Sequence, residues 1–189
     1  MLRKTLLAFT LFAAPSAHAA EVPPAMSQYI YGDLMAWVNN DQIVQAISAQ
    51  NRSIGELNQT EIIARDGIWR TEIGETDRPT VNAVLNAPLS DFLRSRQSES
   101  NGRITEVFVM DRYGLNVAAS DMTSDYWQGD EAKFTETFAR GSGAVYIGDI
   151  ELDESSQTYQ GQVSFAVTDP ETGSVIGAIT VGLNAEPFY

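Results

Sequence analysis

The residues best suited to chemistry are concentrated in one short segment, between Ser120 and Phe134. Carboxylate, aromatic and amide side chains follow one another there, at Asp125, Tyr126, Trp127, Gln128 and Asp130. Aromatic ring faces attract a cation, and a carboxylate supplies its counter-charge. Because ligand pockets are mostly apolar with a few placed polar groups, this mixture is typical of a binding site for a small amine.

Two further regions carry candidate ligand-binding residues. Lys133 lies one helical turn beyond Asp130, where its ammonium group could hold a ligand carboxylate. Tyr146 and Asp149 lie three residues apart on the following strand, so an undistorted strand would point them to opposite faces. A bulge at Gly148 would bring both into one site. An amino acid or a related zwitterion would use both the lysine and an aspartate.

Most of these residues also have a structural interpretation. The two aspartates of the first segment could cap the helix that is expected to end near residue 140, and its two aromatic residues could fill the hydrophobic core. The tyrosine and the aspartate of the following strand could mark a strand end near solvent. The sequence leaves both interpretations open.

The other charged residues indicate surface roles. Arg65, Arg70 and Arg112 could hold a carboxylate, but in so acidic a chain they are interpreted as partners in surface ion pairs. The acidic segment 151–156 resembles an oxygen-rich calcium site, yet it lacks the spacing of an EF-hand loop and predicts a solvated turn. We therefore expect no metal site and no cofactor.

Composition excludes most catalytic chemistry. The chain has 189 residues, no cysteine and a single histidine, His18. Catalytic thiols, thiolate zinc sites and iron–sulfur clusters all need cysteine. Histidine bases and imidazole ligands are lost if the segment that contains His18 is removed. Paired carboxylates could still hydrolyse glycosides, but nothing in the sequence places two acids in one cleft, so we expect a protein that is not an enzyme.

The first 19 residues have the three parts of a secretory signal peptide. Arg3 and Lys4 precede an apolar run over residues 6–14, and Ala17 and Ala19 are the small residues that cleavage requires. The apolar run is shorter than the roughly 18–20 residues of a membrane span. The sequence therefore predicts a periplasmic protein whose residues 20–189 form a single ligand-binding domain.

We predict that the exported protein begins at Ala20, because the small residues before it meet the cleavage requirement. N-terminal sequencing of protein recovered from the periplasm checks this prediction. An exported form that retains Met1 would contradict it.

The charge of the remaining chain excludes nucleic acid as a partner. Removal of Arg3 and Lys4 leaves ten basic residues against 25 acidic ones, a net charge of −15 at neutral pH. Such a charge repels phosphate backbones and anionic lipid surfaces. No segment after residue 19 is long and apolar enough to cross a bilayer, so we expect no membrane anchor after signal cleavage.

Helical periodicity dominates the first half of the chain. Apolar residues recur at three-, four- or seven-residue spacing over residues 25–50, which predicts one long amphipathic helix. Its apolar positions are Met26, Ile30, Leu34, Trp37, Val38, Val44 and Ile47. Residues 56–71 and 80–97 predict two further helices. Because such helices are stabilised mainly by burial, Trp37→Ala should cost about 3–5 kcal/mol if the ring is buried.

From residue 103 onward the apolar period changes to two, which is typical of strands. Five strands are predicted, over residues 104–110, 115–120, 144–152, 160–168 and 174–184. Turn residues at 111–114 and 169–173 join the first pair and the last pair as hairpins, and a short helix is expected within 121–140. The last strand is apolar on both faces, so we expect it to lie centrally in an antiparallel sheet.

These elements and their order resemble a Cache domain, an extracytoplasmic relative of the PAS fold. The hairpin VFVMDRYGLNVAAS, the segment DYWQGDE and the closing strand IGAITVGL carry the resemblance, which covers about residues 25–184. It implies an α+β fold in which a long N-terminal helix packs on a five-stranded antiparallel sheet of order 2-1-5-4-3. It also implies a small-ligand pocket on the other face, lined by the 120–134 segment and the following strand.

Cache domains are usually sensor modules of chemoreceptors, histidine kinases and cyclic-dinucleotide enzymes, flanked by two membrane helices. This sequence departs from that pattern, because a cleavable signal is expected and no second apolar span follows. We therefore expect a soluble accessory to a membrane receptor or transporter, in chemotaxis or other signal transduction, with a small amine, amino acid or carboxylate as ligand. The alternative is an envelope protein–protein interaction module with a vestigial pocket. A cavity lined by aspartate and aromatic atoms would favour the first hypothesis, and a filled interior beside Tyr126 the second.

Overall fold

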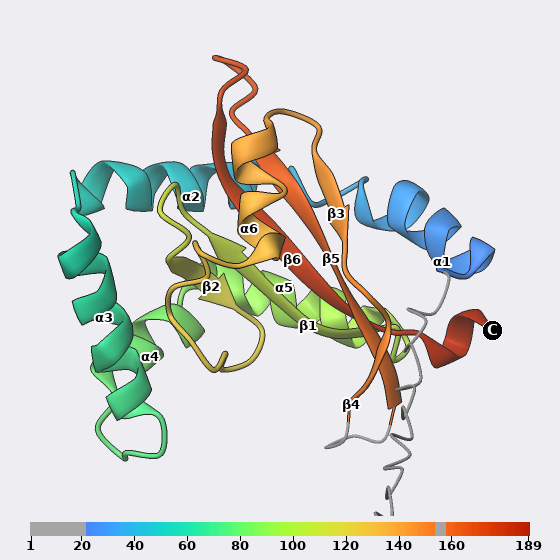
Figure 1. Ribbon diagram of the computed structural model, residues 1–189, viewed down its shortest axis with the longest axis horizontal. Coiled ribbons are helices and arrows are strands. Elements are labelled where there is room, and N and C mark those ends of the chain that lie inside the picture. Colours follow the sequence, from blue (N-terminus) through green and yellow to red (C-terminus); the bar gives the residue numbers. More distant parts are fainter. Residues whose placement is uncertain (1–21, 154–157) are drawn as a thin grey trace, which may run out of the picture.

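The computed structural model describes residues 22–153 and 158–189 (Figure 1). The predicted signal peptide and residues 154–156 of the predicted acidic turn lie outside the described residues. The helices are α1 (Pro24–Tyr29), which continues as a π-helix over Ile30–Leu34, α2 (Asp41–Ile54), α3 (Gln59–Glu72), α4 (Pro79–Leu85), α5 (Pro88–Glu99) and α6 (Ala132–Thr135), with 3₁₀ turns at Phe138–Arg140 and Glu186–Phe188. The strands are β1 (Ile104–Met110), β2 (Asn116–Ala119), β3 (Val145–Ile147), β4 (Glu151–Asp153), β5 (Thr158–Thr168) and β6 (Val175–Asn184).

The prediction of one long helix over residues 25–50 is wrong. The first helical segment ends at Leu34, and α2 begins only at Asp41. Between them, Asn40 has an extended backbone, and its side-chain oxygen accepts a hydrogen bond from the backbone N–H of Ile43 at 3.1 Å. Asparagine favours this N-cap position because its short side chain satisfies a free backbone donor at the start of a helix. The apolar spacing continues across the break, so periodicity alone does not reveal it.

The predicted helix over residues 80–97 is also divided, into α4 and α5. Pro88 stands in the first turn of α5, where its missing N–H costs nothing, but it cannot continue α4. The buried hydroxyl of Ser90 donates a hydrogen bond to the Val84 carbonyl at 2.7 Å and accepts one from the Ala119 N–H at 3.1 Å. This corner therefore ties the two helices to β2.

The sheet confirms the predicted α+β fold class and strand order. Its order is β2-β1-β6-β5-β3, with β4 also paired to β5, and each of these pairings is antiparallel. With β3 and β4 counted as the third predicted strand, this is the predicted order 2-1-5-4-3. The predicted strand over residues 144–152 is divided at Gly148 into β3 and β4, so the sheet of the described residues has six strands rather than five. β6 lies between β1 and β5, which is the central place expected from its apolar sequence.

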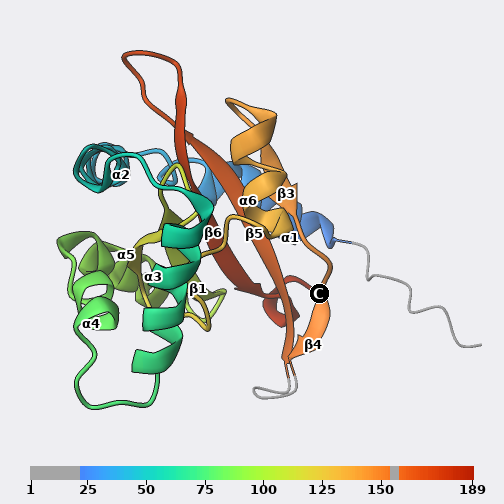
Figure 2. The same ribbon diagram turned by 60° about the vertical axis from the view of Figure 1, so that its left-hand side comes forward.

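The sheet buries a different core on each face, because successive side chains of a strand point to opposite sides. Val107 and Val109 of β1 and Ile179 and Val181 of β6 belong to the first core, which includes residues of α1, α2 and α5. Phe108, which lies between the two valines, belongs to a second core with Trp69, Tyr126 and Phe134. Figure 2 shows α5 and α6 on opposite sides of the sheet.

Trp37 is only half-buried, so Trp37→Ala should reduce stability by less than the value expected for a buried ring. Its ring meets Phe92 edge-on, with ring centroids 6.1 Å apart, at the margin of the first core. Trp69 of α3, by contrast, is fully buried in the second core. Because solvent already reaches part of the Trp37 ring, we expect Trp37→Ala to cost about 1–2 kcal/mol.

Candidate functional site

The predicted segment 125–130 is held by contacts with α3 and with the β1–β2 hairpin. Asp66 is 7% exposed, and its Oδ1 accepts hydrogen bonds from the backbone N–H groups of Tyr126 (2.9 Å) and Trp127 (3.0 Å). The ring of Tyr126 stacks on Trp69 with centroids 5.4 Å apart, and burial raises the pKa of Tyr126 to about 12. The indole N–H of Trp127 donates to the Tyr113 carbonyl at 2.9 Å. These contacts give both aromatic residues a packing role.

Asp125 has an arginine as its partner. Its Oδ1 lies 2.6 Å from Arg70, and Arg70 Nε donates a hydrogen bond to Asp66 Oδ2 at 2.7 Å. The hydrogen bond from Arg70 to Asp66, and then the negative charges of Asp66 and Asp125, raise the pKa of this guanidinium above its usual value. A groove of about 470 Å³, here called the Arg70 groove, crosses this surface and is also lined by Trp127 and the exposed Asp130. The Asp125 carboxylate is therefore already compensated.

Neither aspartate caps the short helix that follows. The N-cap residue of α6 is Glu131, and no side chain makes a cap hydrogen bond there. The interpretation of Asp125 or Asp130 as a helix cap, which the sequence left open, is therefore wrong. Asp125 is paired with Arg70 of α3 instead.

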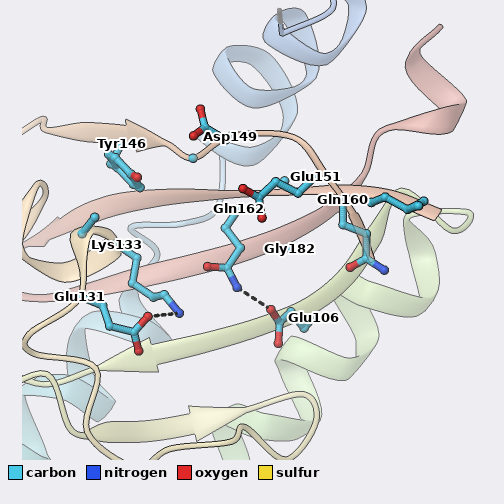
Figure 3. A pocket seen from close by; sticks show the side chains of 13 residues that line it. Glu106, Glu131, Lys133, Tyr146, Asp149, Glu151, Gln160, Gln162 and Gly182 are labelled. Atoms are coloured by element: carbon cyan, nitrogen blue, oxygen red, sulfur yellow. Dashed lines mark hydrogen bonds and ion pairs between the residues drawn. The ribbon is translucent and has the colours of Figure 1, made fainter. Parts of the chain in front are cut away.

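Three predicted residues, Lys133, Tyr146 and Asp149, meet at a different place. They line a cavity of about 640 Å³ between α6, the β3–β4 edge and the open face of the sheet, here called the polar pocket (Figure 3). The other charged and amide residues that line it are Glu106, Glu131, Glu151, Gln160 and Gln162. The structure thus separates these three candidates from Asp125, Trp127 and Asp130, which line the Arg70 groove.

Strand register builds the floor of the polar pocket. Glu106 of β1 and Gln162 of β5 are both paired with Gly182 of β6, so the three residues form one row across the sheet. Because Gly182 has no side chain, Gln162 Nε2 reaches across it and donates a hydrogen bond to Glu106 Oε1 at 2.9 Å (Figure 3). An added Cβ at Gly182 would lie 2.6 Å from Thr105 Oγ1 and 2.7 Å from Glu106 Cγ, so this row requires glycine.

The outer wall of the pocket is the break between β3 and β4. The backbone N–H of Gly148 donates to the Gln162 carbonyl at 2.8 Å, and regular pairing with β5 resumes at Glu151. Tyr146 and Asp149 both line the pocket because of this distortion, which was predicted as a bulge and is instead a break between two strands. The exposed Asp149 carboxylate points away from Lys133 and Glu106 (Figure 3).

Lys133 closes the inner end of the pocket. Its Nζ lies 3.0 Å from Glu131 Oε2, donates to Gln128 Oε1 at 3.2 Å, and lies 5.3 Å from the centroid of the Phe108 ring. Gln128 is 2% exposed, and its Nε2 donates to the Asp125 carbonyl at 2.9 Å. Gln128 is therefore a buried residue that reaches the site only through its side-chain oxygen.

The polar pocket is acidic. The carboxylates of Glu106, Glu131 and Glu151 line it together with one ammonium group, and that ammonium is paired with Glu131. Clefts lined by one sign of charge attract ligands of the opposite sign. The pocket therefore favours a cationic ligand over a carboxylate.

Several pocket residues were not predicted from the sequence: Glu106, Glu131, Glu151, Gln160 and Gln162. A signal for three of them exists, since Glu106 interrupts the apolar run of β1, and Gln160 and Gln162 alternate with apolar or small residues ahead of Ser164 in β5. Polar residues at alternate positions of a strand mark one face as open to solvent or to a site. That the side chains of Glu106 and Gln162 are neighbours depends on strand pairing, which the local sequence does not contain.

Comparison with known proteins gives structural neighbours only; no family model and no curated protein matches the chain. The sensor domain of the V. cholerae histidine kinase DctB is 15% identical to this chain. The match covers 86% of this chain and 53% of the DctB chain, with a TM-score of 0.46. The sensory domain of the Campylobacter jejuni chemoreceptor Tlp3 is 14% identical, with coverages of 87% and 65% and a TM-score of 0.42. The ligand-binding domain of the Pseudomonas aeruginosa amino acid chemoreceptor PctC, in complex with GABA, is 11% identical, with coverages of 86% and 63% and a TM-score of 0.43.

These neighbours are sensory or ligand-binding domains, the kind of domain that the sequence resembles. The chain spans between 53% and 65% of the length of these three. Because TM-scores of 0.42–0.46 are low, the fold assignment rests on the strand order of the chain itself. No helix within residues 22–153 and 158–189 is both long and apolar enough to cross a membrane.

Proposed function

We propose that this domain binds a small organic cation, an amine or an amino acid with its ammonium group innermost, in the polar pocket. The observation that carries the proposal is the lining of the cavity, with three carboxylates and one ammonium that is already paired. A volume of about 640 Å³ suits a small metabolite. A desolvated cation needs negative charge around it, and Glu106, held by Gln162, contributes a carboxylate from the floor of the pocket.

The biological role that we propose is that of an exported sensor. The predicted signal peptide over residues 1–19 supports a periplasmic location, and residues 20–189 would then act as a single domain. Its liganded state would be presented to a membrane receptor or transporter. An envelope interaction module with a vestigial pocket is the alternative, and it is supported if no cation binds.

A matched series of four-carbon probes tests the ligand class by isothermal titration calorimetry on residues 20–189. The probes are n-butylamine, L-2-aminobutyrate and butyrate, which carry a cation, a zwitterion and an anion on nearly the same skeleton. We expect one or both ammonium-bearing probes to bind at least about tenfold more tightly than butyrate, since like charges across a site cost several kcal/mol. Preference for butyrate, or no binding of either ammonium-bearing probe, would contradict the proposal.

Glu106→Gln should weaken binding of the preferred ammonium-bearing probe by about tenfold, because the pocket then has one carboxylate fewer to attract a cation. Glutamine keeps an oxygen that can accept the hydrogen bond from Gln162, so the melting temperature should change little. Asp130→Asn is the matched control, since Asp130 is an exposed acid of the Arg70 groove. If Asp130→Asn weakens binding and Glu106→Gln does not, the ligand occupies the groove rather than the pocket.

A further inference from the structure

The contacts of Lys133 are those of an ammonium-recognition site. A carboxylate at 3.0 Å, an amide oxygen at 3.2 Å and an aromatic ring at 5.3 Å surround its Nζ, and its side chain is only 15% exposed. The three groups come from different places in the sequence, at Glu131, Gln128 and Phe108. Such a combination of charge, hydrogen-bond acceptor and ring face is the one that a ligand amine requires.

We propose that Glu131, Gln128 and Phe108 form the ammonium subsite of the polar pocket, and that Lys133 fills this subsite until a ligand displaces it. This inference rests on the proposed function and deepens it, because it assigns the residues that recognise the amine and a competitor built into the chain. The ligand ammonium would take the place of the Lys133 Nζ.

The surroundings of Gln128 support this assignment. Its Nε2 is engaged by the Asp125 carbonyl, and the residue is 2% exposed, so its Oε1 is held in one orientation toward the pocket. A buried acceptor needs a donor, which Lys133 supplies in the free chain. A ligand ammonium would supply the same donor, so exchange leaves the acceptor satisfied.

Displaced Lys133 would stay in an acidic environment. The pocket that its side chain lines also contains Glu106 and Glu151, so its charge still has carboxylates nearby after it leaves Glu131. Lys133 is less suited to binding a ligand carboxylate, the role that the sequence suggested, because its ammonium already donates to Gln128 and pairs with Glu131.

An internal competitor reduces the apparent affinity for a ligand, in proportion to the fraction of time that the subsite is free.

Lys133→Met should therefore tighten the binding of n-butylamine. Methionine keeps an unbranched apolar side chain but cannot occupy an ammonium subsite. If Lys133 fills the subsite about 90% of the time, its removal makes the apparent dissociation constant about tenfold smaller. Calorimetric titration of the wild type and the variant, both as residues 20–189, measures this ratio.

Loss of one positive charge could by itself favour a cation, so a second substitution separates the two causes. With Lys133 present, Phe108→Leu removes the ring face from both Lys133 and the ligand. The two losses offset each other, so the apparent affinity for n-butylamine should change little. In the Lys133→Met background only the ligand uses the ring, and Phe108→Leu should weaken binding about fivefold. If Phe108→Leu, which alters a buried residue, lowers the melting temperature too far, Glu131→Gln gives the same comparison from a half-buried position.

Each outcome decides the inference. Tighter binding by Lys133→Met, with the second substitution acting only in that background, supports it. If the wild type binds n-butylamine and Lys133→Met binds it equally or more weakly, the inference is overturned while the proposed function stands. If Lys133→Met binds more tightly but the second substitution has the same effect in both backgrounds, the gain comes from the change in charge alone, and the inference is also overturned. If neither protein binds any ammonium-bearing probe, the inference and the proposed function fail together.

Discussion

Trp69→Ala is expected to lower the free energy of unfolding by about 3–5 kcal/mol, the range for truncation of a buried tryptophan. The Trp69 side chain is fully buried, stacks on Tyr126 and donates its indole N–H to the Thr123 carbonyl at 3.0 Å. The substitution therefore creates a cavity in the second core and leaves a buried carbonyl without this donor. Equilibrium urea unfolding, followed by far-UV circular dichroism, measures the loss.

Trp37→Ala is the matched control for this experiment. The same side chain is removed, but Trp37 is half-buried beside Phe92, and the expected loss is about 1–2 kcal/mol. Ligand affinity should be unchanged, because Trp37 belongs to the core on the face of the sheet opposite the polar pocket. A loss for Trp37→Ala equal to that for Trp69→Ala would contradict the assignment of Trp69 as the anchor of the second core.

Asp111→Ala should cost about 2–4 kcal/mol, because it leaves buried backbone donors without acceptors. Asp111 is 0% exposed at the end of β1. Its Oδ1 accepts hydrogen bonds from the N–H groups of Tyr113 (2.8 Å) and Leu115 (3.0 Å), and its Oδ2 accepts one from Gln50 of α2 at 3.0 Å. The carboxylate thus holds the β1–β2 turn and ties it to a helix. Chemical denaturation of the variant and the wild type checks the value.

Asp111→Asn is the control, since asparagine keeps an oxygen for the two turn amides; we expect a loss of stability within about 1 kcal/mol.

Burial raises the pKa of Asp111, against the opposing effect of its hydrogen bonds and of Arg112. A raised folded-state pKa means that its contribution to stability is present below the unfolded pKa, near 3.9, and is lost as the pH rises through the folded value. The stability of the wild type relative to Asp111→Asn should therefore fall over that interval and stay level above it; a rise would contradict the assignment.

Local signals in the sequence determined most of the elements. The change of apolar period near residue 103 separates helices from strands, and the turn residues at 111–114 and 169–173 lie between paired strands in the structure. These features depend on residues a few positions apart, so they can be recognised without knowledge of the tertiary structure. The break at Asn40 was missed because an N-cap interrupts a helix without interrupting its apolar spacing.

The carboxylate, aromatic and amide residues of segment 125–130 were also recognised in the sequence, but their contacts in the folded protein were not. Asp66, about 60 positions earlier, accepts hydrogen bonds from two of its backbone N–H groups, and Arg70 pairs with Asp125. Trp69 covers the ring of Tyr126. Whether a carboxylate is free for a ligand depends on which distant side chain neutralises it, and only the docking of α3 decided that.

The floor of the polar pocket was decided by strand pairing. Glu106, Gln162 and Gly182 lie far apart in the sequence, and they become one row because β6 inserts between β1 and β5 in a particular register. A register shift of one residue would turn each of these side chains to the opposite face. The sequence determined which residues carry charge and which strands form. The long-range pairing of those strands determined which charges face one cavity, because neighbours across a sheet are set by hydrogen bonds between segments that no local pattern connects.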